Sequence, residues 1–276
     1  MRPVPFLSIV SITFRNAVGL RGTLESIARQ SSRDFEVIVI DGGSTDGTRE
    51  VVESFGDLVT HFTSEPDRGI SHAFNKGTAR ARGTLVNYLN AGDRYHGDDV
   101  VAHVHSAYRE HAFPWGFGLM KRIDAAGNVS PSHAGQLLPY SFDALASGRL
   151  LISHQATFFD TALVRQLGAY DETLRQAMDY DLLLRFAADH LPHRFYDPFI
   201  LYDETGVSAR HNLQGLLAKH AARSRALALS PTAKAIDLGR TYARYALGRT
   251  RNATKQTLLR TDLGRAVLRR LGLLET

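Results

Sequence analysis

The chain has no cysteine among its 276 residues. A disulfide framework, a zinc site built from thiolates and a cysteine nucleophile are therefore excluded. Its apolar runs have the length of strands, and none approaches the ~18–20 residues that a membrane-spanning helix needs. The first residues also lack the basic region, unbroken apolar run and small-residue cleavage site of a secretory signal. We therefore expect a cytoplasmic protein.

Several standard functional motifs are missing as well. The sequence has no phosphate loop of the Walker type, no G-x-G-x-x-G segment and no H-E-x-x-H helix. Its 12 histidines are scattered. His96, His103 and His105 lie near one another, but their spacing matches no standard metal site. We expect these three histidines to be structural.

The charge of the chain is distributed unevenly. Residues 219–276 carry 13 Lys and Arg against three acids, whereas the first 218 residues carry 20 basic and 25 acidic side chains. The basic pI is thus a property of the C-terminal part. Together with the helical pattern beyond residue 210, this change predicts a main domain over 1–210 and a basic helical extension over 211–276.

Strand and helix patterns alternate in the first part of the chain. Short β-branched runs at 6–12, 35–40, 59–63 and 85–89 predict buried strands, and apolar residues at helical spacing separate them. This alternation predicts an α/β fold with a mostly parallel central sheet flanked by helices. Ligands bind such sheets at the carboxyl ends of the strands, and a polar cluster follows each of these four runs.

Three of these polar clusters are acidic. Asp41 can accept hydrogen bonds from a uracil-like base or from ribose hydroxyls, and an Asp-Gly turn is the alternative. Asp67 can bind a base or sugar and Arg68 a phosphate, or the pair can form a helix cap with a surface ion pair. Asp93, close after Asn90, suits a hard divalent cation that bridges diphosphate oxygens, unless it only forms a polar turn.

Two more candidates lie in the second half. His154 precedes an apolar run and can touch a phosphate, a metal or an acceptor, or be a satisfied structural histidine. Asp179 and Asp181 begin a helix expected over 178–188. Asp181 better complements the positive helix N-terminus, which leaves Asp179 to face a cleft as a general base. The alternative is that both are ordinary helix-start acids.

In this order, the segments resemble the family 2 glycosyltransferases, which have the GT-A fold. Phe35 to Gly47, which reads FEVIVIDGGSTDG, is close to the most recognisable signature of that family. The resemblance covers roughly residues 6–210. Its other segments are 7–16 (LSIVSITFRN), 64–77, 90–93 (NAGD), 154–155 and 179–185.

The resemblance implies a role for each matching residue. Asp93 would anchor Mg²⁺ or Mn²⁺, and Asp179 would be the catalytic base. The nucleotide would be bound by Thr13, Phe14, Asn16, Asp41, Asp67, Arg68 and Asn75. The acceptor or phosphate side would be formed by Asn90, His154, Gln155, Asp181 and Arg185. The nucleotide-binding half would span about 1–95 and the acceptor half about 96–210.

One segment departs from the family pattern. The metal-binding D-x-D of the family is degenerate here, with Asn90 and Gly92 where acids are usual. The resemblance therefore leaves Asp93 as the one carboxylate of this segment that can hold the metal.

The activity implied is inverting transfer of a sugar from a nucleotide-sugar donor, with UDP-sugars favoured, to a hydroxyl of a glycan or lipid-linked acceptor. The step would be a metal-assisted in-line displacement. The resemblance also implies a role in polysaccharide or glycolipid assembly. Two alternatives are a sugar-phosphate nucleotidyltransferase and a non-catalytic sugar-nucleotide-binding protein. The first should have a glycine-rich basic loop after the first strand, which residues 13–16 (TFRN) do not provide.

The C-terminal segment has its own pattern. Leu259, Leu263, Val267, Leu271 and Leu274 recur at helical spacing among arginines. Such a basic amphipathic helix can lie on an anionic membrane surface, and we expect peripheral contact through 256–274 at the inner face of the cell membrane. Packing of these leucines on the main domain is an equal alternative. No nucleic-acid-binding motif is present, so we expect no nucleic-acid partner.

Overall fold

The computed structural model describes residues 4–124, 126–203, 213–259 and 261. Its internal contacts divide the chain into two compact units, 1–210 and 211–276. Each unit is described by itself below. The catalytic and extension roles expected for these two parts stay predictions.

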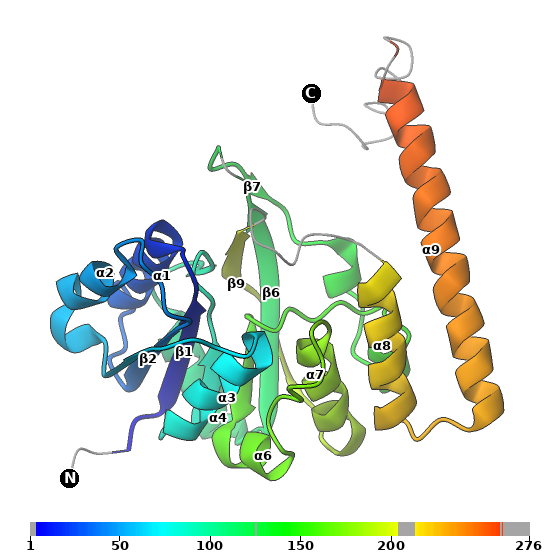
Figure 1. Cartoon of the computed structure of the whole chain (residues 1–276). Helices are drawn as coiled ribbons and strands as arrows, with labels where there is room; N and C mark the ends of the chain where they lie inside the picture. Colours follow the sequence, from blue (N-terminus) through cyan, green and yellow to red (C-terminus); the bar gives the residue numbers. More distant parts are fainter. Residues whose placement is uncertain (1–3, 125, 204–212, 260, 262–276) are drawn as a thin grey trace. The chain divides into compact units, whose positions relative to one another are not determined.

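A central sheet organises the first unit (Figure 1). Among the described residues it has nine strands in the order β3-β2-β1-β4-β8-β6-β9-β5, and β7 pairs with β6. The strands are β1 (Leu7–Thr13), β2 (Phe35–Asp41), β3 (His61–Ser64), β4 (Leu85–Tyr88), β5 (Arg94–Tyr95), β6 (Trp115–Ile123), β7 (Val129–Ser130), β8 (Thr157–Asp160) and β9 (His193–Asp203).

The pairings set the direction of each strand. Parallel pairs join β1 to β2 and β4, β2 to β3, and β6 to β9. β8 is antiparallel to both β4 and β6, so β6 and β9 run in the same direction as β1. β5 and β7 run the opposite way. The expected α/β sheet is confirmed, and the expected parallel pairing holds without interruption in β3-β2-β1-β4.

Helices cover both faces of this sheet. On one face, α1 (Ala17–Ala28), α2 (Thr48–Ser54) and α4 (Val100–His111) contribute Leu20, Val51 and Val104 to a buried cluster that includes Ile9 of β1. On the other face lie α3 (Ile70–Arg80), α6 (Thr161–Gln166) and α7 (Met178–Asp189). The remaining helical turns are η1 (Gly56–Leu58), η2 (Ala134–Gln136) and α5 (Phe142–Ala146).

The strand directions bring distant loops to one edge, which we call the carboxyl edge. Thr13, Asp41, Ser64 and Asp203 are the last residues of β1, β2, β3 and β9. The 90–93 loop follows β4. Because β8 is antiparallel to its neighbours, residues 154–155, just before its start, lie at the same edge. The carboxyl edge therefore collects most of the polar segments expected to bind a ligand.

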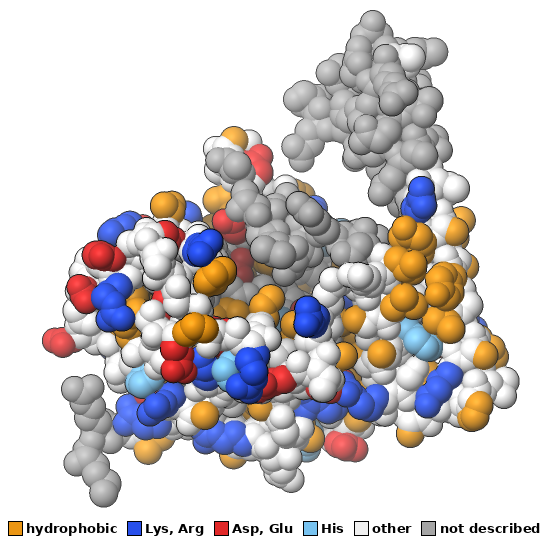
Figure 2. All heavy atoms as spheres, in the orientation of Figure 1, with side chains coloured by type: hydrophobic (Ala, Val, Ile, Leu, Met, Phe, Trp, Pro, Cys, Tyr) orange, Lys and Arg blue, Asp and Glu red, His pale blue; other side chains and the backbone are white. Residues whose placement is uncertain are grey.

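The described residues of the second unit form two helices, α8 (Leu213–Ala226) and α9 (Pro231–Leu259). The side chain of Asp237 joins them, since its carboxylate lies 2.8 Å from Arg223 and 2.6 Å from His220. Hydrophobic side chains are visible on the surface of α9 (Figure 2), and Leu247 is 68% exposed. Most of the 256–274 segment lies outside the described residues. No described helix is long and apolar enough to cross a membrane.

Candidate active site

Asp41 organises the loops that follow the first three strands. Its side chain is only 1% exposed. The Ser44 backbone N–H and the Ser44 and Ser64 hydroxyls donate to its carboxylate at 2.9, 2.5 and 2.6 Å. The Arg15 N–H in turn donates to Ser44 Oγ at 2.7 Å. Asp41 therefore has three donors before any ligand binds, which supports the turn alternative and leaves a ligand-binding role as a prediction.

An exposed aromatic ring meets a carboxylate beside Gly42. A Cβ atom at Gly42 would lie 3.1 Å from Phe14 Cδ2 and 3.3 Å from Asp67 Oδ2. Phe14 is 58% exposed. A ring with a free face can stack a nucleobase, while a neighbouring carboxylate accepts an N–H of that base. The structure thus brings together Phe14 and Asp67, which are 53 residues apart in sequence.

Lys76 holds the other oxygen of Asp67. Its Nζ lies 2.6 Å from Asp67 Oδ1 and 2.9 Å from Glu65 Oε1. His72 Nδ1 is 3.3 Å from the same Asp67 oxygen. Burial opposes the charge of Lys76, but the two carboxylates raise the pKa of its ammonium group. The Asp67 carboxylate is therefore fixed by α3, with Oδ2 next to Gly42.

Arg68 and Asn75 have partners within the protein. Arg68 forms an exposed ion pair with Glu172 at 2.7 Å. Asn75 Nδ2 donates to the Tyr170 carbonyl, and the Tyr170 N–H donates to Asn75 Oδ1, both at 2.9 Å. These contacts connect α3 to the loop before α7. The nucleotide contacts expected of both residues stay predictions.

Asn16 and Thr13 lie at the end of β1. Asn16 Oδ1 caps α1 by accepting the Gly19 N–H at 3.0 Å, and its Nδ2 donates to the Ala91 carbonyl at 3.1 Å. Asn16 therefore joins the β1 loop to the 90–93 loop. Thr13 Oγ1 is buried and has no hydrogen-bond partner among the described residues.

Asp93 is buried where the metal ligand was expected. It is 4% exposed, and the Thr23 hydroxyl anchors its backbone carbonyl at 2.7 Å. Its carboxylate accepts the Asp203 N–H at 3.1 Å and a hydrogen bond from the Gln155 side chain. Burial, together with the charge of Asp203, raises the pKa of Asp93 to about 7 despite these hydrogen bonds. Both causes disfavour the charged form of the Asp93 carboxylate.

The sequence analysis missed Asp203. Its segment, Ile200-Leu201-Tyr202-Asp203, ends an apolar strand with an acid, as β2 does with Asp41. That shared pattern was the signal available in the sequence. The Asp203 carboxylate lies directly beside Gly92, so it reaches the same loop as Asp93.

The residues at this end fit a hard divalent cation. Asn90 Oδ1 is buried, and nothing in the described part of the chain donates to it. Mg²⁺ and Mn²⁺ prefer oxygen ligands, and Mg²⁺ often takes only one or two carboxylates with phosphate and water completing its shell. No group of three or more His, Cys, Asp or Glu side chains suited to a metal occurs in the described ranges. A cation here would therefore take some of its ligands from a bound diphosphate.

His154 is internal and does not lie on an open acceptor surface. It is 4% exposed, and its Nε2 lies 2.5 Å from the Tyr170 hydroxyl. Its ring stacks on Tyr88 at 5.2 Å. Burial lowers the pKa of His154 to about 4, although the charge of Asp179 opposes this shift. This geometry supports the structural alternative for His154.

Asp179 occupies the first turn of α7 and is partly exposed. Its Oδ1 accepts the Tyr180 N–H at 2.8 Å. The charge of Asp179 acts on His154 and opposes the lowering of its pKa, and the side chain of the next residue, Gln155, forms a hydrogen bond with Asp93. Of these two adjacent residues, one is thus influenced by the charge of Asp179 and the other bonds to Asp93.

Asp181 and Arg185 form a buried structural pair. Arg185 Nε lies 3.0 Å from Asp181 Oδ2, and Asp181 is 1% exposed. The same guanidinium donates to the carbonyls of Leu167 and Ala169 at 2.5 and 2.6 Å. Asp181 thus binds Arg185, and it lies in the first turn of α7, where an acid complements the helix N-terminus. The expected acceptor-side roles of the pair stay predictions.

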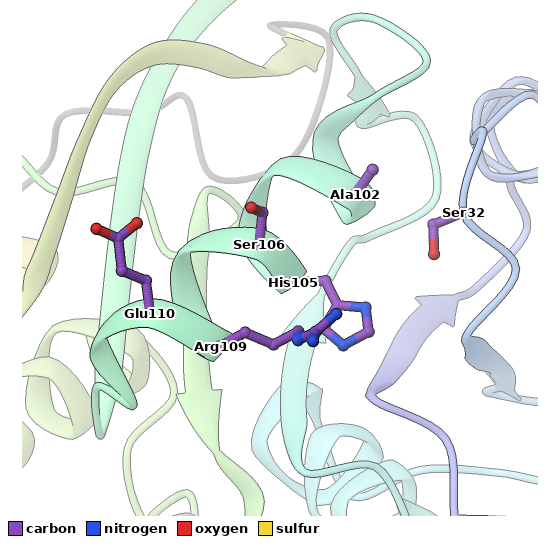
Figure 3. A pocket seen from close by; sticks show the side chains of 6 residues that line it. All are labelled: Ser32, Ala102, His105, Ser106, Arg109 and Glu110. Atoms are coloured by element: carbon purple, nitrogen blue, oxygen red, sulfur yellow. The ribbon is translucent and has the colours of Figure 1, made fainter.

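A separate hollow lies away from these residues. It has a volume of about 520 Å³ and sits on α4 (Figure 3). His105, one of its lining residues, stacks on Phe6, just before β1 begins. The hollow is therefore at the edge where the parallel strands start, opposite to the carboxyl edge. Its lining residues are Ser32, Ala102, His105, Ser106, Arg109 and Glu110.

Comparison with known proteins identifies the family. The model of glycosyl transferase family 2 matches residues 8–159. This chain belongs to glycosyl transferase family 2. An uncharacterized glycosyltransferase of Mycobacterium tuberculosis strain H37Rv is 32% identical over 213 residues, which cover 76% of this chain and 79% of that protein. Membership favours glycosyl transfer over the nucleotidyltransferase and non-catalytic alternatives.

Solved structures share the fold of this family 2 glycosyltransferase. Staphylococcus aureus TarS residues 1–349 with UDP-GlcNAc superimposes with a TM-score of 0.67 at 17% identity, covering 87% of this chain and 72% of that one. The chain spans 43% of the longer TarS chain. The mannosyltransferase PcManGT of Pyrobaculum calidifontis, with GDP-Man and Mn²⁺, gives 0.61 at 18% identity, covering 98% and 80%. Both are GT-A glycosyltransferases, which confirms the expected fold class.

Proposed function

We propose that this glycosyltransferase moves a sugar from a nucleotide-sugar, with UDP-sugars preferred, to a hydroxyl of a glycan or lipid-linked acceptor, with inversion at the anomeric carbon. The observation that carries the proposal is that Phe14, Asp67, Asp93 and residues 154–155 all lie in loops at the carboxyl edge. Such a transfer requires a site for the nucleobase, a site for the cation and a nearby residue that accepts the proton of the acceptor hydroxyl.

The nucleoside would bind at the Phe14 end. Uracil presents one N–H between two carbonyls, and Asp67 Oδ2 lies beside the exposed Phe14 ring to accept it. TarS has been solved with UDP and with UDP-GlcNAc, and PcManGT with GDP-Man. These complexes support a nucleotide-sugar donor, and the UDP preference rests on Asp67.

The diphosphate would bind at the Asp93 end. Asp93 and Asn90 would hold Mg²⁺ or Mn²⁺ there, and PcManGT has been solved with Mn²⁺. When bound, the cation neutralises the negative charge that develops on the leaving diphosphate. The residues around Asp93 are already positioned by Thr23 and Gln155, so little rearrangement is needed at that moment.

Asp179 would act on the acceptor. Its carboxylate accepts the hydroxyl proton as the acceptor oxygen bonds to the anomeric carbon, and the bond from that carbon to the diphosphate oxygen breaks. Attack from the face opposite the leaving group inverts the configuration. Burial keeps the neighbouring His154 neutral near pH 7, so it does not neutralise Asp179 by charge.

The test is the substitution Asp179→Asn. We expect it to abolish transfer while affinity for UDP stays within a few-fold of the wild type, because only the proton acceptor is lost. Asp189→Asn, at the exposed C-terminal end of the same helix, is the control and should transfer normally. NMR of the product with a panel of nucleotide-sugars gives the donor and the anomeric configuration. Wild-type turnover by D179N would refute its role as base.

We further infer peripheral attachment of this cytoplasmic enzyme to an anionic membrane. On α9, Ile236 and Leu247 are exposed on one face about three helical turns apart, and Arg240 and Arg244 are exposed near them. Apolar and basic side chains together favour an anionic bilayer surface. The full chain should sediment with phosphatidylglycerol vesicles, and I236D/L247D should not. Equal recovery of both in the supernatant would count against attachment.

A further inference from the structure

We propose that Asp203 is the second carboxylate of the cation site and replaces, in space, the acid that the D-x-D segment lacks at position 92. The inference rests on the proposed function, because it concerns the cation of that reaction. It assigns a role to a residue 110 positions away from Asp93, outside every segment that carries the family resemblance.

Strand pairing places Asp203 against the 90–93 loop. β5 and β9 are antiparallel, with Arg94 opposite Leu201 and Tyr95 opposite Ile200. Continuing this register by two residues sets Gly92 opposite Asp203. The Asp203 N–H donates to Asp93 Oδ1 at 3.1 Å, which fixes the end of β9 to the loop. The backbone pairing of β5 and β9 therefore holds Asp203 opposite Gly92.

Gly92 leaves the space that Asp203 fills. A Cβ atom at position 92 would lie 3.1 Å from Asp203 Oδ2 and 3.4 Å from Asp203 Cβ. The φ angle of Gly92 is +107°, a conformation that side-chain-bearing residues rarely adopt. An acid at position 92 and the observed Asp203 would thus compete for one volume. The glycine that removes the usual acid also admits the substitute.

The oxygen atoms of this arrangement suit a divalent cation. Asp93 is almost fully buried, and a second carboxylate faces the same loop. Carboxylate oxygens are ligands that a hard divalent cation prefers, and two neighbouring acids can supply them to one ion. Asn90 Oδ1 adds a buried neutral oxygen without a donor in the described residues. Two carboxylates and one amide oxygen leave the remaining positions of Mg²⁺ or Mn²⁺ to phosphate and water.

Asp203 also has a backbone role, and the substitution must separate the two. Asp203→Asn keeps the N–H that donates to Asp93 and nearly the same side-chain shape, and it removes only the charge. Asp203→Ser keeps the same N–H and gives a second variant if the first folds poorly. Asp197→Asn is the matched control, because it neutralises an exposed acid of the same strand.

The experiment measures Mn²⁺ binding by electron paramagnetic resonance of free Mn²⁺, using the full chain with saturating UDP. We expect D203N and D93N each to weaken Mn²⁺ binding by about tenfold or more, in the range seen for changes around metal ligands. D197N should match the wild type. Affinity for UDP in the absence of metal should be unchanged in D203N.

Each outcome separates this inference from the proposed function. If D93N loses Mn²⁺ while D203N and D203S bind it like the wild type, Asp203 is not a ligand and the inference fails, but the proposed cation site stands. If the wild type itself binds no Mn²⁺ with UDP, both the inference and the metal-assisted step fail. Loss of Mn²⁺ in D203N with normal metal-free UDP binding supports the inference.

Discussion

The two acidic ends of the carboxyl edge differ in what surrounds their carboxylates. Asp41 and Asp93 are both nearly inaccessible to solvent. Asp41 accepts three hydrogen bonds from serine groups, whereas Asp93 accepts two and faces another acid, Asp203. A buried carboxylate whose oxygens all accept hydrogen bonds has a structural role and stabilises the fold. One with fewer donors and a like charge beside it is suited to a cation. Burial alone therefore does not mark a binding acid.

The largest expected effect is on the pH dependence of stability at the Asp93 end. In the folded chain the pKa of Asp93 is about 7, above its ordinary 3.8. Between these two values the folded state holds a proton on Asp93 that the unfolded state releases. The contribution of Asp93 to the free energy of unfolding is therefore most favourable below about pH 4 and is lost as the pH rises to about 7. Relative to D93N, the metal-free wild type should lose up to about 4 kcal/mol over this window. Urea unfolding with a chelator at several pH values measures it, and parallel pH profiles would contradict it.

The next effect concerns the Asp41 end. Asp41→Ala removes the acceptor of the Ser44 N–H and the Ser44 and Ser64 hydroxyls, and it leaves buried donors unsatisfied. We expect a loss of about 2–3 kcal/mol in the free energy of unfolding. D203N in chelator should lose much less, because it relieves repulsion. Equal destabilisation of the two variants would remove the distinction between the ends.

The smallest effect sharpens the comparison at the base site. Phe14→Ala should weaken UDP binding by about 1–2 kcal/mol, because base stacking on the ring is lost. The ring is largely exposed, so the melting temperature should stay close to that of the wild type. Calorimetric titration with UDP measures the affinity, and Val18→Ala, at another exposed apolar position, is the control. Unchanged affinity would place the base elsewhere.

Local patterns predicted the parts of the site that depend on single strands. The rule that parallel strands end at one edge correctly located Asp41 and the 90–93 loop, because an apolar run followed by an acid is visible in the sequence. The helix containing Asp179 was predicted over 178–188 and spans Met178–Asp189. Membership of the family and the α/β fold were both confirmed.

Contacts between distant segments were beyond such patterns. Asp203 meets Gly92 only because β5 pairs with β9, and a two-residue strand such as β5 leaves little periodicity to read. His154 is buried by Tyr88 and Tyr170, which come from different parts of the chain. The internal partners of Asn75 and Arg185 are likewise set by tertiary packing. Residue type indicated chemistry, and packing decided which groups are available for it.

The most direct test of the account asks which edge of the sheet binds the donor. Calorimetric titration with UDP and Mn²⁺ would compare the wild type, D93N and R109A, the last altered in the hollow at the opposite edge. The account predicts that D93N loses the Mn²⁺-dependent gain in UDP affinity and that R109A binds like the wild type. Normal Mn²⁺-dependent binding by D93N together with lost binding by R109A would contradict it.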